Sequence, residues 1–174
     1  MKWKIPALLL FLVSIGCSGP KVVYDYDDQV DFHQFRTYDI YPELQTGLSM
    51  LDEKRLLEAV DAVMQEQGFS KSTSPDLYIN IFSEQFQEPS RNSLGVGISG
   101  GSRGLGVGIS GGVPVGAPDR YQVLVLDLID VGADQLIWQA EVQAKWNANA
   151  SPEQRRAWFQ KSLTKAFSAY PPKK

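Results

Sequence analysis

The sequence has one cysteine, one histidine and no large excess of either charge. A single cysteine cannot form an internal disulfide, so a disulfide framework is excluded. The 17 basic and 20 acidic side chains leave a net charge of −3. Because a mildly acidic surface offers phosphate no attractive field, nucleic acid is not expected as a partner.

Long hydrophobic runs are also missing. The apolar run Ile5–Ile15 is shorter than the roughly 18–20 residues that span a bilayer, so we expect no permanent transmembrane helix. Lys2 and Lys4 precede this run, and the small Gly16 follows it. A basic start, about 7–15 apolar residues and a small residue at the cut are typical of a secretory signal. We therefore predict that residues 1–16 are a signal peptide.

The position of the single cysteine supports a lipid anchor. The stretch Val13-Ser14-Ile15-Gly16-Cys17 resembles the lipobox of bacterial lipoproteins, although Ser14 stands where a leucine-like residue is usual. We expect cleavage before Cys17, lipid on its sulfur, and a tether at residues 17–20; an ordinary signal with a chance cysteine is the alternative. Ser18 is not the aspartate of an inner-membrane retention signal. This favours the outer membrane, facing the periplasm, with the inner membrane and the cell surface left open.

Residues 21–174 form one predicted domain. Alternating apolar residues predict strands at 21–26, 35–41, 76–86, 121–130 and 136–146. Helical spacing predicts a helix between Ser49 and Gly68 and another after Ser151-Pro152, each opened by a serine N-cap. Leu56, Val60 and Val63 of the first should pack beside Phe159, Leu163 and Phe167 of the second. The fold class expected is α+β, a mainly antiparallel sheet with both helices on one face.

A Gly-rich insert is predicted at residues 90–118. Leu94–Gly101 recurs letter for letter as Leu105–Gly112. Each copy formally matches the dinucleotide fingerprint, but no helix follows to receive a pyrophosphate. We therefore expect no nucleotide, and a flexible loop or thin hairpin instead.

Acidic residues near the amino terminus suggest a calcium loop at first sight. Numbered from Asp25, however, such a loop places Val30 where glycine is needed and Arg36 where glutamate is needed. Turn residues are the better interpretation of this cluster. We expect no metal and no cofactor other than the lipid on Cys17. The cluster consists of Asp25, Asp27, Asp28 and Asp31.

No catalytic residues are predicted, and the chain is not expected to be an enzyme. With Cys17 acylated and His33 the only histidine, neither a Cys–His pair nor a serine triad that uses histidine can be assembled. A hydrolase with two carboxylates stays open, with Asp127 and Asp130 as its acids. Three tryptophans could line a groove for an apolar ligand or a peptide, although core packing explains the first better: Trp138, Trp146 and Trp158.

Short motifs spread over the mature chain resemble an uncharacterised family of bacterial lipoproteins, the domain-of-unknown-function family numbered 4136. Only the order of the motifs is specific. The resemblance implies an anchored, single-domain α+β envelope protein with a Gly-rich or variable insert, and it supplies no catalytic residues. The motifs are residues 23–27, Asp31-Phe32, residues 35–38, Gly68-Phe69, residues 75–80, residues 126–130 and residues 136–140.

The leading hypothesis is a non-enzymatic, lipid-anchored periplasmic domain that binds another envelope protein. A carrier of a small apolar ligand is the second hypothesis, and an envelope hydrolase is the third. An aromatic-lined cavity would favour the carrier, and two acids converging in a cleft would favour the hydrolase. A solid core with one exposed apolar patch would favour the binding domain.

Overall fold

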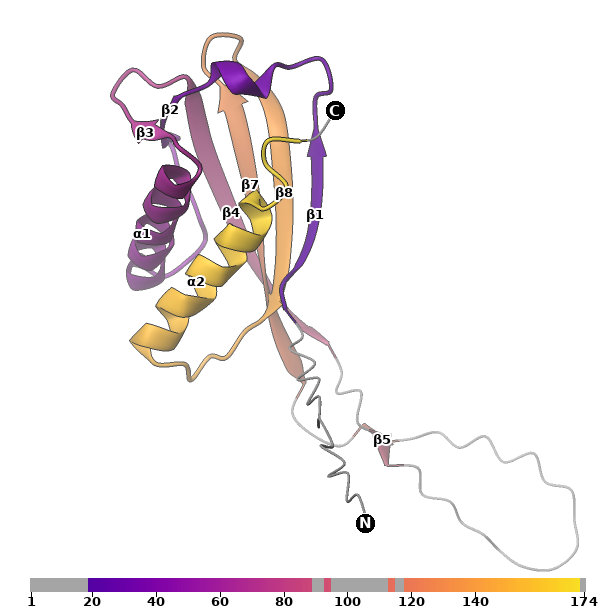
Figure 1. The fold of residues 1–174 in the computed structure, drawn as a ribbon. Helices are drawn as coiled ribbons and strands as arrows, with labels where there is room; N and C mark the ends of the chain where they lie inside the picture. Colours follow the sequence, from indigo (N-terminus) through magenta and orange to yellow (C-terminus); the bar gives the residue numbers. More distant parts are fainter. Residues whose placement is uncertain (1–18, 89–92, 95–112, 115–117, 173–174) are drawn as a thin grey trace, which may run out of the picture.

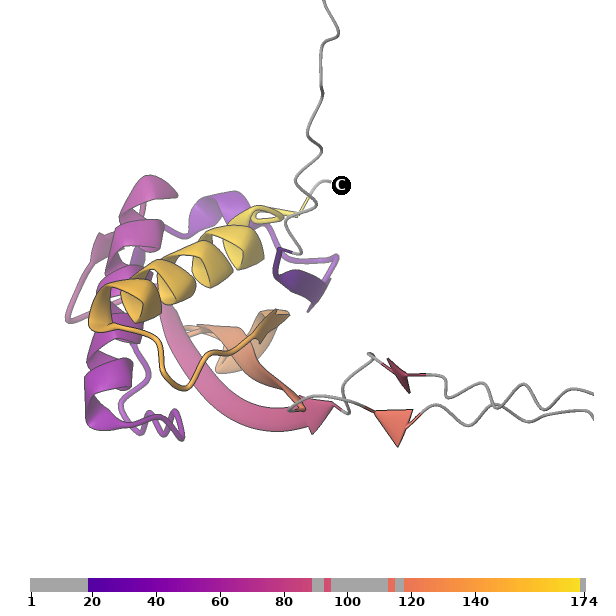
Figure 2. The same cartoon turned by 90° about the horizontal axis from the view of Figure 1, so that it is seen from below.

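The computed structural model describes residues 19–88, 93–94, 113–114 and 118–172. Its main feature is a six-stranded sheet in the order β1-β8-β7-β4-β2-β3, with two helices on one face (Figures 1 and 2). The elements are β1 Lys21–Tyr26, the 3-10 helix η1 Phe32–Gln34, β2 Thr37–Ile40, α1 Met50–Glu66, β3 Ser70–Lys71, β4 Leu77–Glu88, β5 Ser93–Leu94, β6 Val113–Pro114, β7 Asp119–Asp130, β8 Gln135–Lys145 and α2 Pro152–Phe167.

Four neighbouring strands, β1, β8, β7 and β4, are antiparallel. Alternation along β7 and β8 places one set of side chains under the helices, as the sequence pattern predicts. Leu124, Leu126 and Leu128 of β7 are fully buried there, opposite Val142, Ala140 and Trp138 of β8. The other face of these strands carries no helix (Figure 2).

The sheet is mixed, so the prediction of a mainly antiparallel sheet is wrong. β2 runs parallel to both β4 and β3. The reason is the crossover through α1, which leaves the end of β2 and returns the chain to the start of β3. Parallel neighbours need a connection of roughly a dozen residues or more, usually a helix, and this strand–helix–strand order was already visible in the sequence.

Serine caps fix the starts of both helices. The Ser49 side chain accepts a hydrogen bond from the N–H of Asp52, and Ser151 forms a capping box with Gln154. Gly68 follows α1 with φ +87°, the left-handed conformation expected at that position. The predicted boundaries of the helices are therefore close to the observed ones.

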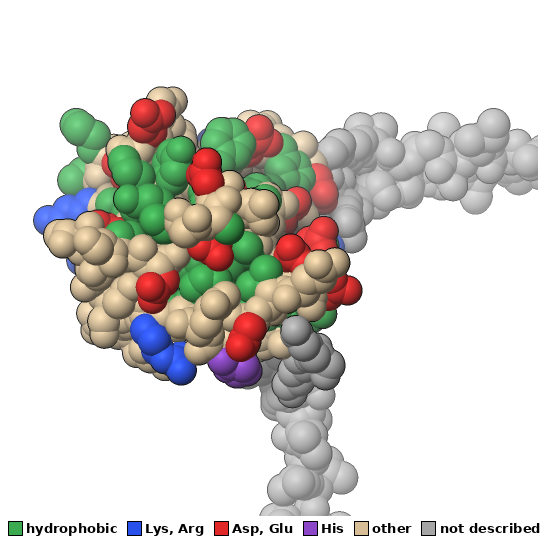
Figure 3. Space-filling view, turned by 90° about the horizontal axis from the view of Figure 1, so that it is seen from above, with side chains coloured by type: hydrophobic (Ala, Val, Ile, Leu, Met, Phe, Trp, Pro, Cys, Tyr) green, Lys and Arg blue, Asp and Glu red, His purple; other side chains and the backbone are tan. Residues whose placement is uncertain are grey.

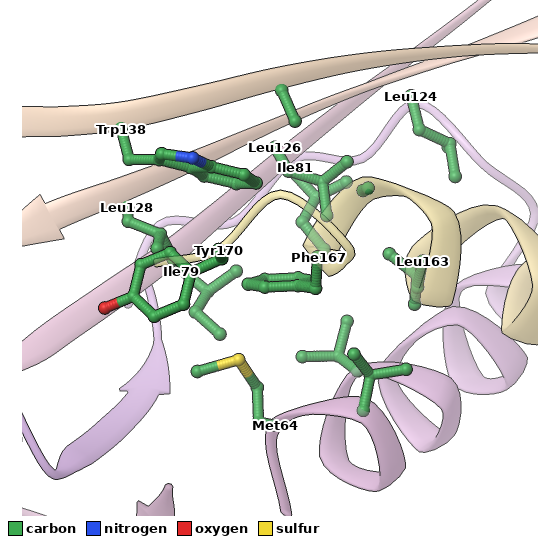
Figure 4. Close-up of a cluster of buried hydrophobic side chains, with 14 of the residues drawn as sticks. Met64, Ile79, Ile81, Leu124, Leu126, Leu128, Trp138, Leu163, Phe167 and Tyr170 are labelled. Carbon is green, nitrogen blue, oxygen red and sulfur yellow. The ribbon is translucent and has the colours of Figure 1, made fainter. Parts of the chain in front are cut away.

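The core lies between the helices and one sheet face. Figure 4 shows Phe167 of α2 between Trp138 of β8 and Met64 of α1. The Trp138 and Phe167 rings stack with their centroids 5.2 Å apart. The stripes predicted to pack together all belong to this single buried cluster: Leu56, Val60, Val63, Phe159, Leu163 and Phe167.

Two predicted regions fall largely or wholly outside the described residues. The predicted signal peptide and Cys17 lie within residues 1–18. Of the Gly-rich insert, the paired strands β5 and β6 and residue 118 are described. Among the helices of the described ranges, none is long and apolar enough to cross a membrane.

Candidate interaction site

One edge of the sheet is formed by β1, which pairs with β8 alone in the part of the chain that the structure describes. The Asp27 N–H donates to the Ile137 carbonyl oxygen at 3.0 Å and continues the ladder between the two strands. Because backbone groups alternate along an edge strand, Val22, Tyr24 and Tyr26 direct theirs away from β8. The Asp25 carboxylate accepts the Tyr26 N–H at 2.9 Å. Within the described residues, the outward groups of Val22 and Tyr24 have no hydrogen-bond partner.

A groove of about 970 Å³ lies beside this edge. It runs between β1, η1 and the segment that follows α2, which come together at one end of the molecule (Figure 1). Tyr24 and Tyr26 face it because they stand opposite Ala140 and Trp138, on the helix side of the sheet. The lining residues are Tyr24, Tyr26, Asp31, Phe32, His33 and residues 168–172.

Aromatic packing holds the wall of the groove. Asp31 caps η1 by accepting the His33 N–H at 3.0 Å, which turns Phe32 inward. The Phe32 ring then lies edge-on to Tyr26, at 6.2 Å, and to Tyr170, at 5.7 Å. Such edge-to-face pairs add about 0.5–1.5 kcal/mol beyond their buried area. The wall is therefore a packed, preformed surface.

Tyr170 brings an unpaired polar atom to this wall. Its side chain is 8% exposed, and its hydroxyl has no hydrogen-bond partner within the part of the chain that the structure describes. Burial raises the pKa of Tyr170, so the hydroxyl keeps its proton. A buried hydroxyl without a partner costs about 1–3 kcal/mol. Tyr170 thus holds a buried hydrogen-bond donor within the packed wall of the groove.

The groove end of the molecule is acidic. In Figure 3, acidic side chains are spread over this end, among hydrophobic ones, and basic side chains lie toward its margin. Asp27 accepts the Gln29 N–H at 2.9 Å, which is the turn role expected of the aspartate cluster. In the described ranges, no group of three or more His, Cys, Asp or Glu is arranged to hold a metal ion.

The two acids considered for a hydrolase have structural partners. Asp127 lies on the helix-free face, where its carboxylate accepts from Asn80 Nδ2 at 3.2 Å and Gln139 Nε2 at 2.8 Å. This row ties β4, β7 and β8 together. Asp130 accepts the N–H groups of Gly132 and Ala133 at 2.8 and 3.1 Å. That carboxylate therefore shapes the β7–β8 turn.

The three tryptophans do not share one groove. Trp138 is 1% exposed and packs in the core under α2. Trp146 follows the opposite end of β8, about 26 Å away along an extended strand. There it meets Trp158 edge-on at 5.1 Å, and the Arg155 guanidinium lies 4.8 Å from its ring centroid. Trp158 Nε1 donates to the Lys145 carbonyl oxygen at 2.9 Å.

Sequence reasoning missed the groove because its walls come from opposite ends of the chain. β1 and η1 supply one wall, and residues 168–172 supply the other. The available signals were the tyrosines that share one side of β1 and the pair Pro171-Pro172 directly after the last helix.

Fold and site together define an α+β domain with an open edge strand beside an aromatic groove. Residues 22–172 match the family described as "Domain of unknown function (DUF4136)". The chain belongs to that family, as its motifs predicted.

Comparison with solved structures supports the fold alone. A PDZ domain protein from Parabacteroides distasonis ATCC 8503 is similar with a TM-score of 0.56 and 15% identity. The match covers 90% of this chain, which spans only 37% of that protein's length. The PelC dodecamer from Paraburkholderia phytofirmans gives a TM-score of 0.46 at 10% identity, covering 83% of this chain and 95% of that one. No curated protein matches the chain.

Proposed function

We propose that this chain is a lipid-anchored, non-enzymatic envelope domain that binds an extended segment of another envelope protein along β1. The lipid would sit on Cys17, at the periplasmic face of the outer membrane. The observation that carries the binding proposal is the open edge of β1 beside the groove. The leader and the lipobox-like stretch carry the anchoring proposal.

The open edge supports strand addition. An added segment would form main-chain hydrogen bonds with the outward groups of Val22 and Tyr24. Its alternate side chains would enter the groove, between Tyr24 and Tyr26 on one side and Pro171 on the other. This division gives affinity through the backbone and selectivity through the groove.

Charge favours a basic segment. Asp31 lines the groove, and Asp25, Asp27 and Asp28 lie along the adjacent end of β1 and its turn. Complementary charge speeds encounter and disfavours acidic competitors. A partner segment with Lys or Arg between apolar residues fits this surface best.

The edge is also limited in length. Asp25 already occupies the outward N–H of Tyr26, so within the described residues only Val22 and Tyr24 offer both an N–H and a carbonyl on that side of β1, and Tyr26 offers its carbonyl alone. Charged side chains and short edges are the usual protection against open-ended strand pairing. The protein would therefore accept one short segment rather than aggregate through this edge.

Site-specific photocrosslinking in intact cells tests the binding proposal. With p-benzoylphenylalanine in place of Tyr24, we expect one dominant protein adduct. The same probe in place of Glu58, exposed on α1, should not give that adduct. Val22→Pro removes an outward N–H without breaking the β1–β8 ladder and should abolish the adduct, whereas Val22→Thr should keep it. Equal yields from both probe positions, or an adduct that survives Val22→Pro, would contradict strand addition.

Cell fractionation tests the anchor. Cys17→Ser removes the lipid acceptor, so the variant should move from the membrane pellet to the soluble periplasmic fraction. The unchanged protein should resist a high-salt wash of the same membranes. If the variant still sediments after that wash, lipid on Cys17 is not the anchor.

A carrier of a small apolar ligand is the second candidate. The volume of the groove lies in the range of about 300–1,000 Å³ that is usual for small-molecule sites, and Tyr26, Phe32 and Tyr170 line it. A carrier should bind N-phenyl-1-naphthylamine saturably, and Val22→Pro should leave that binding unchanged. Strand addition predicts instead that Val22→Pro abolishes binding of the partner segment.

A further inference from the structure

Two adjacent apolar side chains protrude from the first turn of α1. Met50 is 89% exposed and Leu51 is 66% exposed. Of the large hydrophobic side chains in the described ranges, Met50 has the highest exposed fraction. Neither residue belongs to the buried stripe of α1, so the packing of the helix does not account for them.

The acids of the same turn are directed into the fold. Asp52 is 7% exposed and binds Arg55 and Arg155, each at 2.7 Å. Glu53 Oε2 accepts the Thr46 hydroxyl at 2.6 Å. The exposed side chains at the start of α1 are therefore Met50, Leu51 and, one turn further on, Lys54. An apolar tip with a neighbouring cation suits the boundary between lipid headgroups and acyl chains.

This tip lies at the end of the molecule from which the tether leaves. Figure 1 shows the first turn of α1, the first turn of α2 and the start of β1 at one end, with η1 and the β7–β8 turn at the other. Cys17 precedes Lys21, the first residue of β1, by four positions, which span at most about 14 Å. A lipid on Cys17 would thus bring this end to the bilayer.

We propose that Met50 and Leu51 insert between the headgroups and acyl chains of the membrane leaflet that carries the Cys17 lipid, with Lys54 on anionic headgroups. This inference rests on the proposed lipid anchor. The contact fixes the orientation of the domain, because attachment through one cysteine alone does not. The groove at the opposite end then faces away from the bilayer, toward its partner.

An environment-sensitive probe tests this contact on the full lipidated protein. Once Cys17 is acylated, Met50→Cys carries the only free thiol, which can be labelled with a nitrobenzoxadiazole fluorophore. In vesicles of phosphatidylethanolamine and phosphatidylglycerol, emission should shift to the blue and rise, because the probe moves from water into the apolar boundary of the bilayer. Lipids with a shallow doxyl group should quench it. The control, Thr73→Cys in the exposed loop before β4, should keep the emission seen in water.

Flotation of the same samples separates failure of the anchor from failure of the contact. Protein that does not float with the vesicles would disprove the lipid anchor. Protein that floats, but whose probe at position 50 behaves like the probe at position 73, would overturn the membrane contact alone.

A second pair of variants assigns the contact to these side chains. With the probe on Lys54→Cys, the double change Met50→Gln and Leu51→Gln should return the emission to its value in water. Leu136→Gln is the matched control, because Leu136 is 52% exposed at the opposite end of the molecule. An unchanged signal in the double variant would overturn the proposal.

Discussion

Both ends of the helix pair contain aromatic contacts, but they differ in how much charge takes part. Where α1 and α2 begin, Asp52 bridges Arg55 and Arg155 at 2.7 Å, and Arg155 covers the Trp146 ring. Where the helices end, the contacts are aromatic: Trp138 stacks on Phe167 and meets Tyr170 edge-on at 5.8 Å. The charged end lies near the start of β1, and the aromatic end builds the groove.

This difference predicts that the two ends contribute unequally to folding stability. Fully buried aromatic side chains contribute several kcal/mol each through area and packing. A partly exposed ion pair contributes less, because water and salt screen it. The aromatic end should therefore carry most of the folding stability while it also supplies a wall of the groove. The charged end should mainly set how the two helices start relative to each other.

The largest effect is expected at the aromatic end. Phe167 is fully buried between Trp138 and Met64, so Phe167→Ala should lower the free energy of unfolding by about 3–5 kcal/mol. Urea titration of the purified protein, followed by Trp fluorescence, measures this loss. Phe167→Leu, which keeps most of the volume, should lose much less. A loss below about 1 kcal/mol for Phe167→Ala would show that this end is not the stable one.

The next effect concerns α2, whose buried and exposed sides should respond differently to substitution. Leu163 is fully buried, and Leu163→Ala should cost about 2–5 kcal/mol. Lys161 is exposed on the same helix, and Lys161→Ala should stay within about ±0.5 kcal/mol. The same urea titration measures both variants. Equal losses would mean that α2 does not dock through its Leu163 side.

Much of this fold could be predicted from residue patterns. The serine caps at Ser49 and Ser151 and the glycine at position 68 located the helices, since capping depends on neighbours in the sequence. Period-two alternation located β4, β7 and β8. The direction of β2 was not predicted, because four residues carry no signal of whether the neighbouring strand is parallel. Only the helical crossover after β2 holds that information.

The candidate site was less predictable, for a physical reason. Asp127 and the tryptophans stand out in the sequence by residue type, yet the structure places Asp127 in a polar row across three strands and Trp138 in the core. The groove depends instead on where residues 168–172 return beside β1. Such a long-range approach is set by tertiary packing, which local patterns do not encode.

A moderate effect is expected at the charged end. Arg155→Met keeps much of the side-chain volume but leaves Asp52 with Arg55 and the Ser49 hydroxyl. We expect a loss of about 2–3 kcal/mol, below the 3–5 of a fully buried pair, because the Arg155 side chain is 20% exposed. Thermal unfolding at low and high salt measures it. The difference from the unchanged protein should shrink at 1 M salt, and a difference that does not depend on salt would assign the loss to packing over Trp146.

The smallest effect depends on pH and concerns Asp76, which links β2 to the start of β4. Its carboxylate accepts the N–H groups of Arg36 and Thr37 at 2.8 and 2.9 Å. These hydrogen bonds, of which the one from Arg36 has the larger effect, hold the pKa of Asp76 below its usual 3.8. A carboxyl group whose pKa is lower in the folded state stabilises the fold at pH values above its unfolded-state pKa. This contribution is lost as the pH falls through its folded-state pKa. Asp76→Asn should therefore cost about 1 kcal/mol at pH 7 and progressively less below pH 4. Urea titrations at pH 7, 5 and 3 measure the trend, and a cost that stays constant down to pH 3 would contradict it.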